Sequence, residues 1–257
     1  MTSVSYANSP KNGPSQEFGR LDIRDYDTAL DYLDGLDAAV ILIVGSGKMF
    51  KTGTMFSLLN ACPTLGNRLK ALYKYPVPEK LLERMFPPWK NSIYKADTLQ
   101  DVLPESVLII DDLSRMLGSR GSGANKDLQE NQPEISHKSV VEIGTVQNLS
   151  NADIALFRDQ DLIRIYKYSR ADAISFERPE FMKDSLTANY QIARAVNVLK
   201  ERGQEINQLY LSWIPRFHRL IYLDPPNWYG RAHTHVLRYD LPDEDGDDNV
   251  PGVYYVS

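Results

Sequence analysis

Residues 38–52 read AAVILIVGSGKMFKT, an apolar run that passes directly into a glycine-rich turn ending in Lys-Thr. The seven apolar residues predict a strand buried on both faces, as in a parallel sheet. The turn matches the pattern G-x-x-x-x-G-K-[ST] at Gly45, Lys51 and Thr52. In such a loop the backbone N–H groups surround phosphates, the lysine reaches the β- and γ-phosphates, and the hydroxyl binds Mg²⁺. This stretch therefore predicts a strand, a phosphate-binding loop and a helix in succession.

The second glycine position of the pattern holds Phe50, although glycine there supplies a backbone conformation or a close approach that a side chain resists. An alternative register makes Lys48 the phosphate lysine, but Met49 would then stand where a magnesium-binding hydroxyl is needed. We therefore take Lys51 as the phosphate lysine and Lys48 as a second phosphate contact. A glycine-rich turn that binds nothing is the structural alternative. The predicted nucleotide-binding loop comprises Gly45, Ser46, Gly47, Lys48, Met49, Phe50, Lys51, Thr52 and Gly53.

A second apolar run, residues 107–110, ends in Asp111 and Asp112. We expect Asp111 to hold Mg²⁺ together with Thr52, and Asp112 to orient the attacking water, a role that a glutamate has in many ATPases. Aspartate is shorter by one methylene group. The structural alternative is that Asp112 caps a following helix. The two motifs in this order favour a site for ATP and Mg²⁺.

A third strand is predicted over residues 140–146, followed by Gln147. Because side chains alternate along a strand, Thr145 and Gln147 project to the same side at its tip. If this strand lies between the other two, Gln147 faces the γ-phosphate and can sense hydrolysis through a hydrogen bond. The alternative is an ordinary polar strand exit that faces solvent.

Strand-like and helix-like segments alternate along the rest of the chain, and this predicts an α/β fold whose mainly parallel sheet is flanked by helices on both faces. Residues 118–136 are polar, contain three glycines and predict a long functional or mobile loop. Further strands are expected at 69–75, 162–168, 220–223 and 235–239, and helices at 25–33, 52–60, 79–85, 98–103, 114–117, 151–158 and around 192–199.

Composition limits the class of protein. The chain has 257 residues and a single cysteine, Cys62, which excludes an internal disulfide and fits a reducing compartment. No apolar stretch approaches the ~20 residues that span a bilayer, and residues 1–17 lack the apolar segment of a signal peptide. Of the 34 acidic residues, six lie in 240–249, so residues 1–239 carry 29 basic and 28 acidic residues. We expect a flexible arm over 1–18, one domain over 19–239, an acidic tail over 240–257, and a cytoplasmic location.

The segment GTVQNLS at residues 144–150, followed by Asp153, Arg158 and residues 161–163, resembles the FtsK–HerA ATPases. That group includes packaging ATPases of membrane-containing viruses and zonular-occludens-toxin-like phage proteins. His137, just before the strand, also fits the group. The resemblance covers residues 38–168, and Phe50 and Asp112 depart from its usual pattern. It implies a P-loop NTPase of the additional-strand type that uses ATP and Mg²⁺, forms a homo-oligomeric ring, and acts on nucleic acid, with double-stranded DNA as the expected partner.

A ring ATPase needs an arginine that completes the site of the neighbouring subunit. Arg120 in the glycine-rich loop and Arg158 beyond the third strand are candidates, with Arg115 as a further one, although each also fits an ordinary surface arginine. His233 and His235 have no nearby Cys or acidic partner in the sequence, so we do not interpret them as metal ligands.

We expect the catalytic residues to be Lys51, Asp112, Gln147, Arg120 and Arg158. The leading hypothesis is a viral genome-packaging ATPase, located in the host cytoplasm or associated with the virion. The alternative is a nucleotide-binding regulatory or assembly protein with weak hydrolysis, which Phe50 favours. A nucleoside or small-molecule kinase is a third hypothesis, for which no acceptor-site motif is identified.

Overall fold

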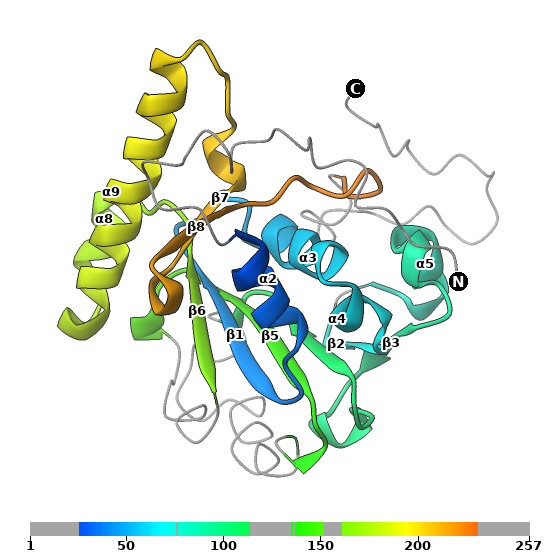
Figure 1. Ribbon diagram of the computed structural model, residues 1–257. Coiled ribbons are helices and arrows are strands. Elements are labelled where there is room, and N and C mark those ends of the chain that lie inside the picture. Colours follow the sequence, from blue (N-terminus) through cyan, green and yellow to red (C-terminus); the bar gives the residue numbers. More distant parts are fainter. Residues whose placement is uncertain (1–25, 76, 114–134, 136, 152–160, 231–257) are drawn as a thin grey trace.

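The computed structural model describes residues 26–75, 77–113, 135, 137–151 and 161–230 (Figure 1). In these residues one eight-stranded sheet has the order β3-β2-β4-β5-β1-β6-β7-β8. The strands from β3 to β6 pair in parallel, while β7 pairs antiparallel with both β6 and β8. The predicted α/β fold with a mainly parallel sheet is therefore confirmed. The strands are β1 (Ala39–Val44), β2 (Lys70–Tyr73), β3 (Ile93–Ala96), β4 (Val107–Ile110), β5 (Val141–Val146), β6 (Leu162–Tyr166), β7 (Leu211–Ile214) and β8 (Arg219–Tyr222).

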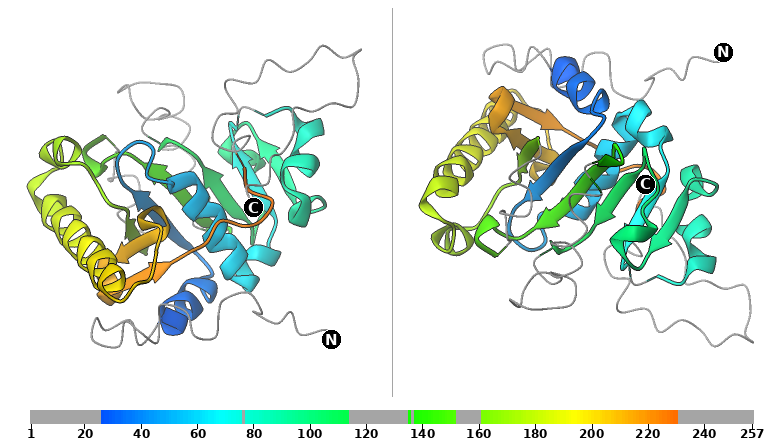
Figure 2. Two further views of the ribbon diagram at one scale, coloured as in Figure 1. Left: turned by 90° about the horizontal axis from the view of Figure 1, so that it is seen from above. Right: turned by 90° about the horizontal axis from the view of Figure 1, so that it is seen from below.

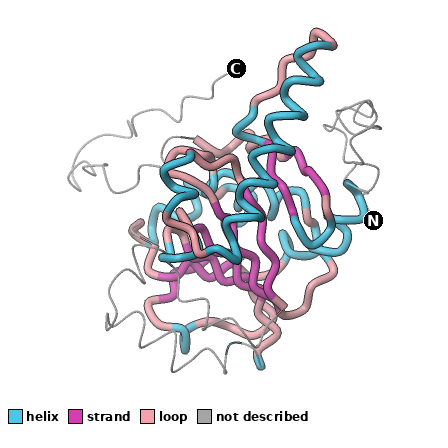
Figure 3. Tube along the Cα trace, turned by 90° about the vertical axis from the view of Figure 1, so that its left-hand side faces the viewer, coloured by secondary structure: helices cyan, strands magenta, loops and turns pink. Residues whose placement is uncertain are grey.

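Helices cover both faces of the sheet. Residues of α2 and α3 pack against one face, while Ala188, Ile192 and Leu199 of α9 pack against the other. Figure 1 and Figure 2 place α9 beside the β6–β8 end of the sheet and α5 at the β3 end. Figure 3 shows α9 as the long helix that projects beyond the sheet. The helices are α2 (Tyr26–Asp34), α3 (Lys51–Ala61), α4 (Pro63–Asn67), α5 (Glu79–Met85), α8 (Ala171–Ser175) and α9 (Pro179–Glu201), with 3₁₀ turns η1 (Pro87–Trp89), η2 (Leu99–Asp101), η3 (Leu149–Asn151), η5 (Gln208–Tyr210) and η6 (Pro215–Phe217).

The central strand β1 is buried along its whole length. All six of its residues, Ala39–Val44, are at most 1% exposed, as the uninterrupted apolar run predicts. Burial of apolar surface stabilises a fold by about 25 cal/mol per Å², so this strand contributes to stability along its whole length. Alternate residues of β1 belong to the two separate cores on either side of the sheet.

Cys62 lies in the core between α3 and α4, with its thiol 3.9 Å from the carbonyl oxygen of Leu30. Burial raises the pKa of this thiol to about 12. Among the residues described, no helix combines the length and the hydropathy that a membrane span requires.

Some of the expected elements differ from those observed. Residues 98–103 do not form an α-helix but a single 3₁₀ turn, η2, in which Thr98 and Asp101 form a reciprocal capping box. The sequence patterns missed two strands, β3 and β7. The expected strand at 235–239, the helices at 114–117 and 151–158, most of the loop 118–136, the arm and the acidic tail lie outside the described residues, so those expectations stay predictions.

Candidate functional site

The order of the strands brings three polar segments to one edge of the sheet. Strand β5 lies between β1 and β4, with Val44 opposite Val146 and Ile110 opposite Gly144. The three parallel strands therefore end side by side, and residues 45–52, 111–112 and 145–147 meet there. This juxtaposition is the condition under which Gln147 was expected to face a γ-phosphate. The carboxyl ends of parallel strands are also where ligands bind in open α/β sheets.

The loop after β1 presents backbone N–H groups at the start of α3. The first intrahelical bond runs from Thr54 N to Phe50 O at 2.8 Å, and no side chain caps the helix. The N–H groups of residues 51–53 precede that bond and thus have no intrahelical acceptor. Lys48 and Phe50 have left-handed backbone conformations, with φ of 65° and 57°. The loop therefore adopts the conformation that glycine would favour, even where it carries side chains.

Lys51 is half-buried and Lys48 is exposed. Lys51 Nζ donates a hydrogen bond to the carbonyl oxygen of Ser46 at 3.0 Å, inside its own loop. Burial lowers the pKa of Lys51, and the nearby carboxylates of Asp112 and Asp111 oppose that shift. A half-buried ammonium group held by a carbonyl is suited to bind an entering anion. This geometry favours the register in which Lys51 is the phosphate lysine.

Asp111 is held by two threonine hydroxyls. Thr52 Oγ1 lies 2.9 and 3.1 Å from the two carboxylate oxygens of Asp111, although the residues are 59 positions apart in the chain. Thr145 Oγ1 donates to Asp111 Oδ1 at 2.7 Å and accepts from Asp112 N at 2.8 Å. Burial raises the pKa of Asp111, while the hydrogen bonds from Thr145 and Thr52 act in the opposite direction. The strand tips of β4 and β5 and the start of α3 are thus joined through one carboxylate.

A hydroxyl and a carboxylate side by side are oxygen donors of the kind that Mg²⁺ prefers. Magnesium ions bound with nucleotides usually take one or two protein ligands and complete an octahedron with phosphate oxygens and water. Thr52 and Asp111 fit that role. The described part of the chain holds no cluster of three His, Cys, Asp or Glu side chains that could bind a metal without help.

The remaining predicted catalytic residues differ in how far the structure places them. Asp112 is half-buried beside Lys51, with a left-handed φ of 55°. The helix that it was alternatively expected to cap falls among residues that are not described. Gln147 is exposed directly after β5. Arg120 and Arg158, like Arg115, lie outside the described residues, and their roles stay predictions.

The sequence analysis missed a buried lysine behind the loop. Lys167, directly after β6, is 1% exposed, and its Nζ donates to Ser212 Oγ of β7 at 3.0 Å. Its backbone N–H donates to Val44 O at 2.7 Å, and a Cβ added to Gly45 would lie 2.7 Å from Lys167 Cβ. Burial and the charge of Lys51 lower the pKa of Lys167 to about 7. Gly45 is therefore required for the close approach of Lys167, in addition to any contact with phosphate.

Helices α8 and α9 support the loops of the site through polar side chains. Asn189 of α9 accepts from Ser169 N at 2.7 Å and donates to Ser169 O at 2.6 Å. The next residue, Arg170, donates its N–H to Ser46 Oγ in the loop at 2.8 Å. Between the two helices, Glu177 accepts from Leu149 N at 2.6 Å, just after β5. One helix pair thus holds the segments that follow β1, β5 and β6.

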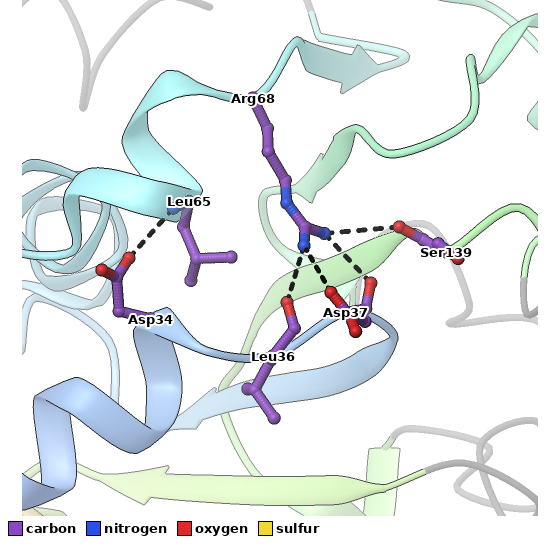
Figure 4. Close-up of polar contacts among 6 residues, drawn as sticks. All are labelled: Asp34, Leu36, Asp37, Leu65, Arg68 and Ser139. Atoms are coloured by element: carbon purple, nitrogen blue, oxygen red, sulfur yellow. Dashed lines mark hydrogen bonds and ion pairs between the residues drawn. The ribbon is translucent and has the colours of Figure 1, made fainter.

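A cavity of about 560 Å³ lies at the other end of the sheet, where the strands begin. Arg68 crosses it and donates to the carbonyl oxygens of Leu36, Asp37 and Ser139 at 2.9, 3.0 and 3.3 Å (Figure 4). Nearby, Asp34 accepts from Leu65 N at 3.0 Å (Figure 4). Arg68 therefore ties together the segments that enter β1 and β5. This cavity is remote from the carboxyl ends of the strands and has no part in the candidate site.

In the observed strand order an additional strand, β5, lies between β1, which leads into the loop, and β4, which ends in aspartate. The fold class predicted from the sequence is confirmed. The sequence itself matches no protein-family model and no curated protein.

Solved structures include similar chains. The DNA-packaging ATPase B204 of Sulfolobus turreted icosahedral virus is 14% identical with a TM-score of 0.43, over 75% of this chain and 99% of that one. B204 of Sulfolobus turreted icosahedral virus 2, in complex with ATPγS, is 13% identical with a TM-score of 0.39, over 73% and 98%. The N-terminal domain of zonular occludens toxin from Neisseria meningitidis is 17% identical with a TM-score of 0.32, over 50% and 76%.

Both groups that the sequence resembled, viral packaging ATPases and zonular-occludens-toxin-like proteins, are thus among the similar structures. At these identities the similarity concerns the fold alone.

Proposed function

We propose that this protein is a Mg²⁺-dependent ATPase that moves nucleic acid, as a genome-packaging ATPase of a virus does. The observation that carries the ATPase proposal is the contact of Thr52 with Asp111 beside Lys51. The site combines a hydroxyl, a carboxylate and an ammonium group with the free N–H groups at the start of a helix. This combination suits a nucleoside triphosphate with its metal ion. The translocation proposal rests on the sequence resemblance to the FtsK–HerA ATPases.

Each residue has a defined role in this proposal. The N–H groups of residues 51–53 and the Lys51 ammonium bind the phosphates, while Thr52 and Asp111 hold Mg²⁺, which when bound neutralises charge on the β- and γ-phosphates. Asp112 accepts a hydrogen bond from the attacking water and aligns it. Gln147 lies at the tip of the intervening strand, where it responds to loss of the γ-phosphate.

The active form in this proposal is a homo-oligomeric ring on double-stranded DNA, with Arg120 or Arg158 acting on the site of the neighbouring subunit. The protein works in the host cytoplasm or in association with the virion. These statements extend the expectations drawn from the sequence.

The test is ATP hydrolysis measured with and without double-stranded DNA. We expect Mg²⁺-dependent turnover that DNA stimulates, and loss of at least 100-fold on Lys51→Ala, since one interaction with transition-state charge contributes about 10²–10³ in rate. Lys200→Ala is the control, because Lys200 is an exposed lysine of α9 outside the loop. Turnover that survives Lys51→Ala contradicts the proposed site.

Phe50 favours a second candidate function, that of a nucleotide-binding regulator that hydrolyses ATP poorly. A left-handed residue with a large side chain occurs where the pattern has glycine, and its ring lies against the first turn of α3. Tight binding of a Mg²⁺–ATP analogue without turnover, in the presence or absence of DNA, supports the regulator over the motor.

A further inference from the structure

Three aromatic side chains from distant parts of the chain meet beside the loop. The ring centroid of Phe50 lies 5.0 Å from that of Tyr210, with the planes inclined at 51°, and 5.4 Å from that of Tyr229 in an edge-to-face contact. Tyr210 also contacts Tyr222 at 5.9 Å. All four side chains are half-buried, so the group is neither part of the closed core nor fully in solvent.

The Phe50 ring lies directly over Gly53. A Cβ added to Gly53 would come within 2.2–2.5 Å of three atoms of that ring. Gly53 carries the last of the three N–H groups at the start of α3, so the ring lies next to the end of this run of amides. A side chain at the second glycine position is therefore accommodated because residue 53 has none.

The order of the strands determines the side of the loop towards which the nucleoside of a bound nucleotide would extend. Asp111 at the end of β4 marks the γ-phosphate end of the site, and β4 lies on one side of β1. The nucleoside is attached at the opposite, α-phosphate end, and so extends towards β6, β7 and β8. Tyr210 stands on that side, because it immediately precedes β7.

Tyr210 is also held rigidly by its backbone. Its N–H donates to Asn207 O at 2.9 Å, and its carbonyl oxygen accepts from Leu223 N at 3.0 Å. In contrast, the aromatic side chains of Tyr73, Tyr75 and Trp89 are 1%, 3% and 6% exposed in the core. They could bind a base only by leaving that core.

We infer that Phe50 and Tyr210 form a stacking surface for the base of the bound nucleotide. The ligand class is a purine nucleoside triphosphate, bound through the flat face of its base rather than through the hydrogen-bonding edge. The inference rests on the proposed phosphate site, and it adds a binding surface for the base, which the phosphate site does not contact. It also gives Phe50 a function that glycine could not supply, which accounts for a left-handed phenylalanine at this position.

The experiment compares two ligands, Mg²⁺–ATPγS and Mg²⁺–tripolyphosphate, by isothermal titration calorimetry. Both ligands present a chain of phosphates, and only the first carries a base. We expect Tyr210→Ala to weaken ATPγS by about 5- to 100-fold, the effect typical of losing one base–aromatic stack. The affinity for tripolyphosphate should stay within about 2-fold of the original protein. Tyr210→Phe keeps the ring and should keep the affinity for ATPγS.

Phe50→Leu provides a second variant, for which we expect the same selective loss of ATPγS. Tyr190→Ala is the matched control, since Tyr190 is a tyrosine of α9 that is 62% exposed. If Tyr210→Ala and Phe50→Leu weaken both ligands equally, the rings only support the loop and the stacking inference is overturned while the phosphate site stands. If the original protein binds neither ligand, the phosphate site is itself wrong, and the inference falls with it.

Discussion

At the scale of single residues, the candidate site stores backbone strain. Lys48, Phe50 and Asp112 have φ of 65°, 57° and 55°, in the left-handed region that side chains other than glycine rarely occupy. Each such residue costs on the order of 1–3 kcal/mol and persists only where its surroundings hold it. For Phe50 those surroundings are Gly53, Tyr210 and Tyr229. The strain is therefore coupled to residues that can be changed one at a time.

Gly53→Ala tests that coupling. Glycine to alanine in a helix ordinarily stabilises by about 0.5–1 kcal/mol, because glycine loses more entropy on folding. Here the added methyl group meets the Phe50 ring, so we expect a loss of about 1–3 kcal/mol, as for overpacking in other proteins. In a Phe50→Ala background the sign should reverse. Chemical denaturation of the four proteins in this double-mutant cycle gives the answer.

Gly47→Ala is the control for this cycle, because a Cβ at Gly47 would meet nothing within 4 Å. Its effect should be the same with and without Phe50. Equal effects of Gly53→Ala in both backgrounds would show that the ring does not rest on Gly53.

Lys167 gives a pH-dependent prediction. Its pKa is lowered to about 7 from an ordinary 10.5 by burial, with the charge of Lys51 acting in the same direction. Between these values the unfolded chain binds more protons, so stability rises with pH across this window, and below pH 7 the buried charge is fully destabilising. Each pKa unit corresponds to about 1.4 kcal/mol. Lys167→Met should therefore stabilise most at pH 6 and progressively less towards pH 10.

Denaturation of the original protein and of Lys167→Met at pH 6, 8 and 9.5 measures this difference directly. Lys200→Met, at an exposed position of α9, controls for the loss of a lysine. A difference between Lys167→Met and the original protein that is constant with pH would show that Lys167 keeps its charge throughout the range.

Several residues that the sequence analysis proposed for the site lie together in the structure, and there is a physical reason for this. Each of these motifs can be recognised from a few consecutive residues: a strand runs into a loop, or a strand ends in a carboxylate. The residues concerned are Gly45, Lys51, Thr52 and Asp111. Their meeting point follows once the strands are parallel and adjacent. Lys167 and Tyr210 could not be found in this way, because a lysine at a strand end and a tyrosine in a turn acquire their neighbours only through the pairing of β6, β7 and β8.

At the scale of elements, the same distinction separates predicted strands from missed ones. β1 (AVILIV) and β4 (VLII) are continuous apolar runs, and this composition indicates burial on both faces of the sheet. β3 (IYKA) and β7 (LSWI) are four residues long and mix polar with apolar side chains. Their strand conformation depends on the neighbour that pairs with them, and such partners are distant in the sequence. A short stretch of sequence therefore does not predict strands of this kind.

The role of α9 as a support for the site is testable at this scale. Asn189→Ala removes both hydrogen bonds to Ser169 and leaves two half-buried backbone groups without that partner. We expect a loss of about 1–3 kcal/mol and faster amide exchange at Ser169 and Arg170, measured by hydrogen–deuterium exchange. Asn197→Ala, at an exposed position of the same helix, should have neither effect. Unchanged exchange in Asn189→Ala would mean that other contacts hold this segment.

At the scale of the whole molecule, the sheet separates two ends with different chemistry. The carboxyl ends of the parallel strands carry Lys51, Asp111 and Asp112, whereas the amino ends are tied together by Arg68 through backbone carbonyls.

The proposed ring makes a prediction about particle size. Because an arginine from the neighbouring subunit would complete each site, binding of an ATP analogue with Mg²⁺ should favour assembly. Light scattering should then give a mass several times the 29.2 kDa of one chain. Lys51→Ala, which lacks the phosphate contact, should stay at the smaller size under the same conditions. A monomer in the presence of saturating analogue would exclude the ring.

The buried thiol of Cys62 offers a native probe of how firmly the nucleotide loop is anchored. It lies just after the last residue of α3, the helix that begins at Lys51. A maleimide can react only when the packing of α2, α3 and α4 around the thiol opens, because the closed thiol is both inaccessible and protonated. The rate of labelling therefore measures how often this packing opens. A lower rate in the presence of a nucleotide would show that a ligand at the start of α3 stabilises the packing at its other end.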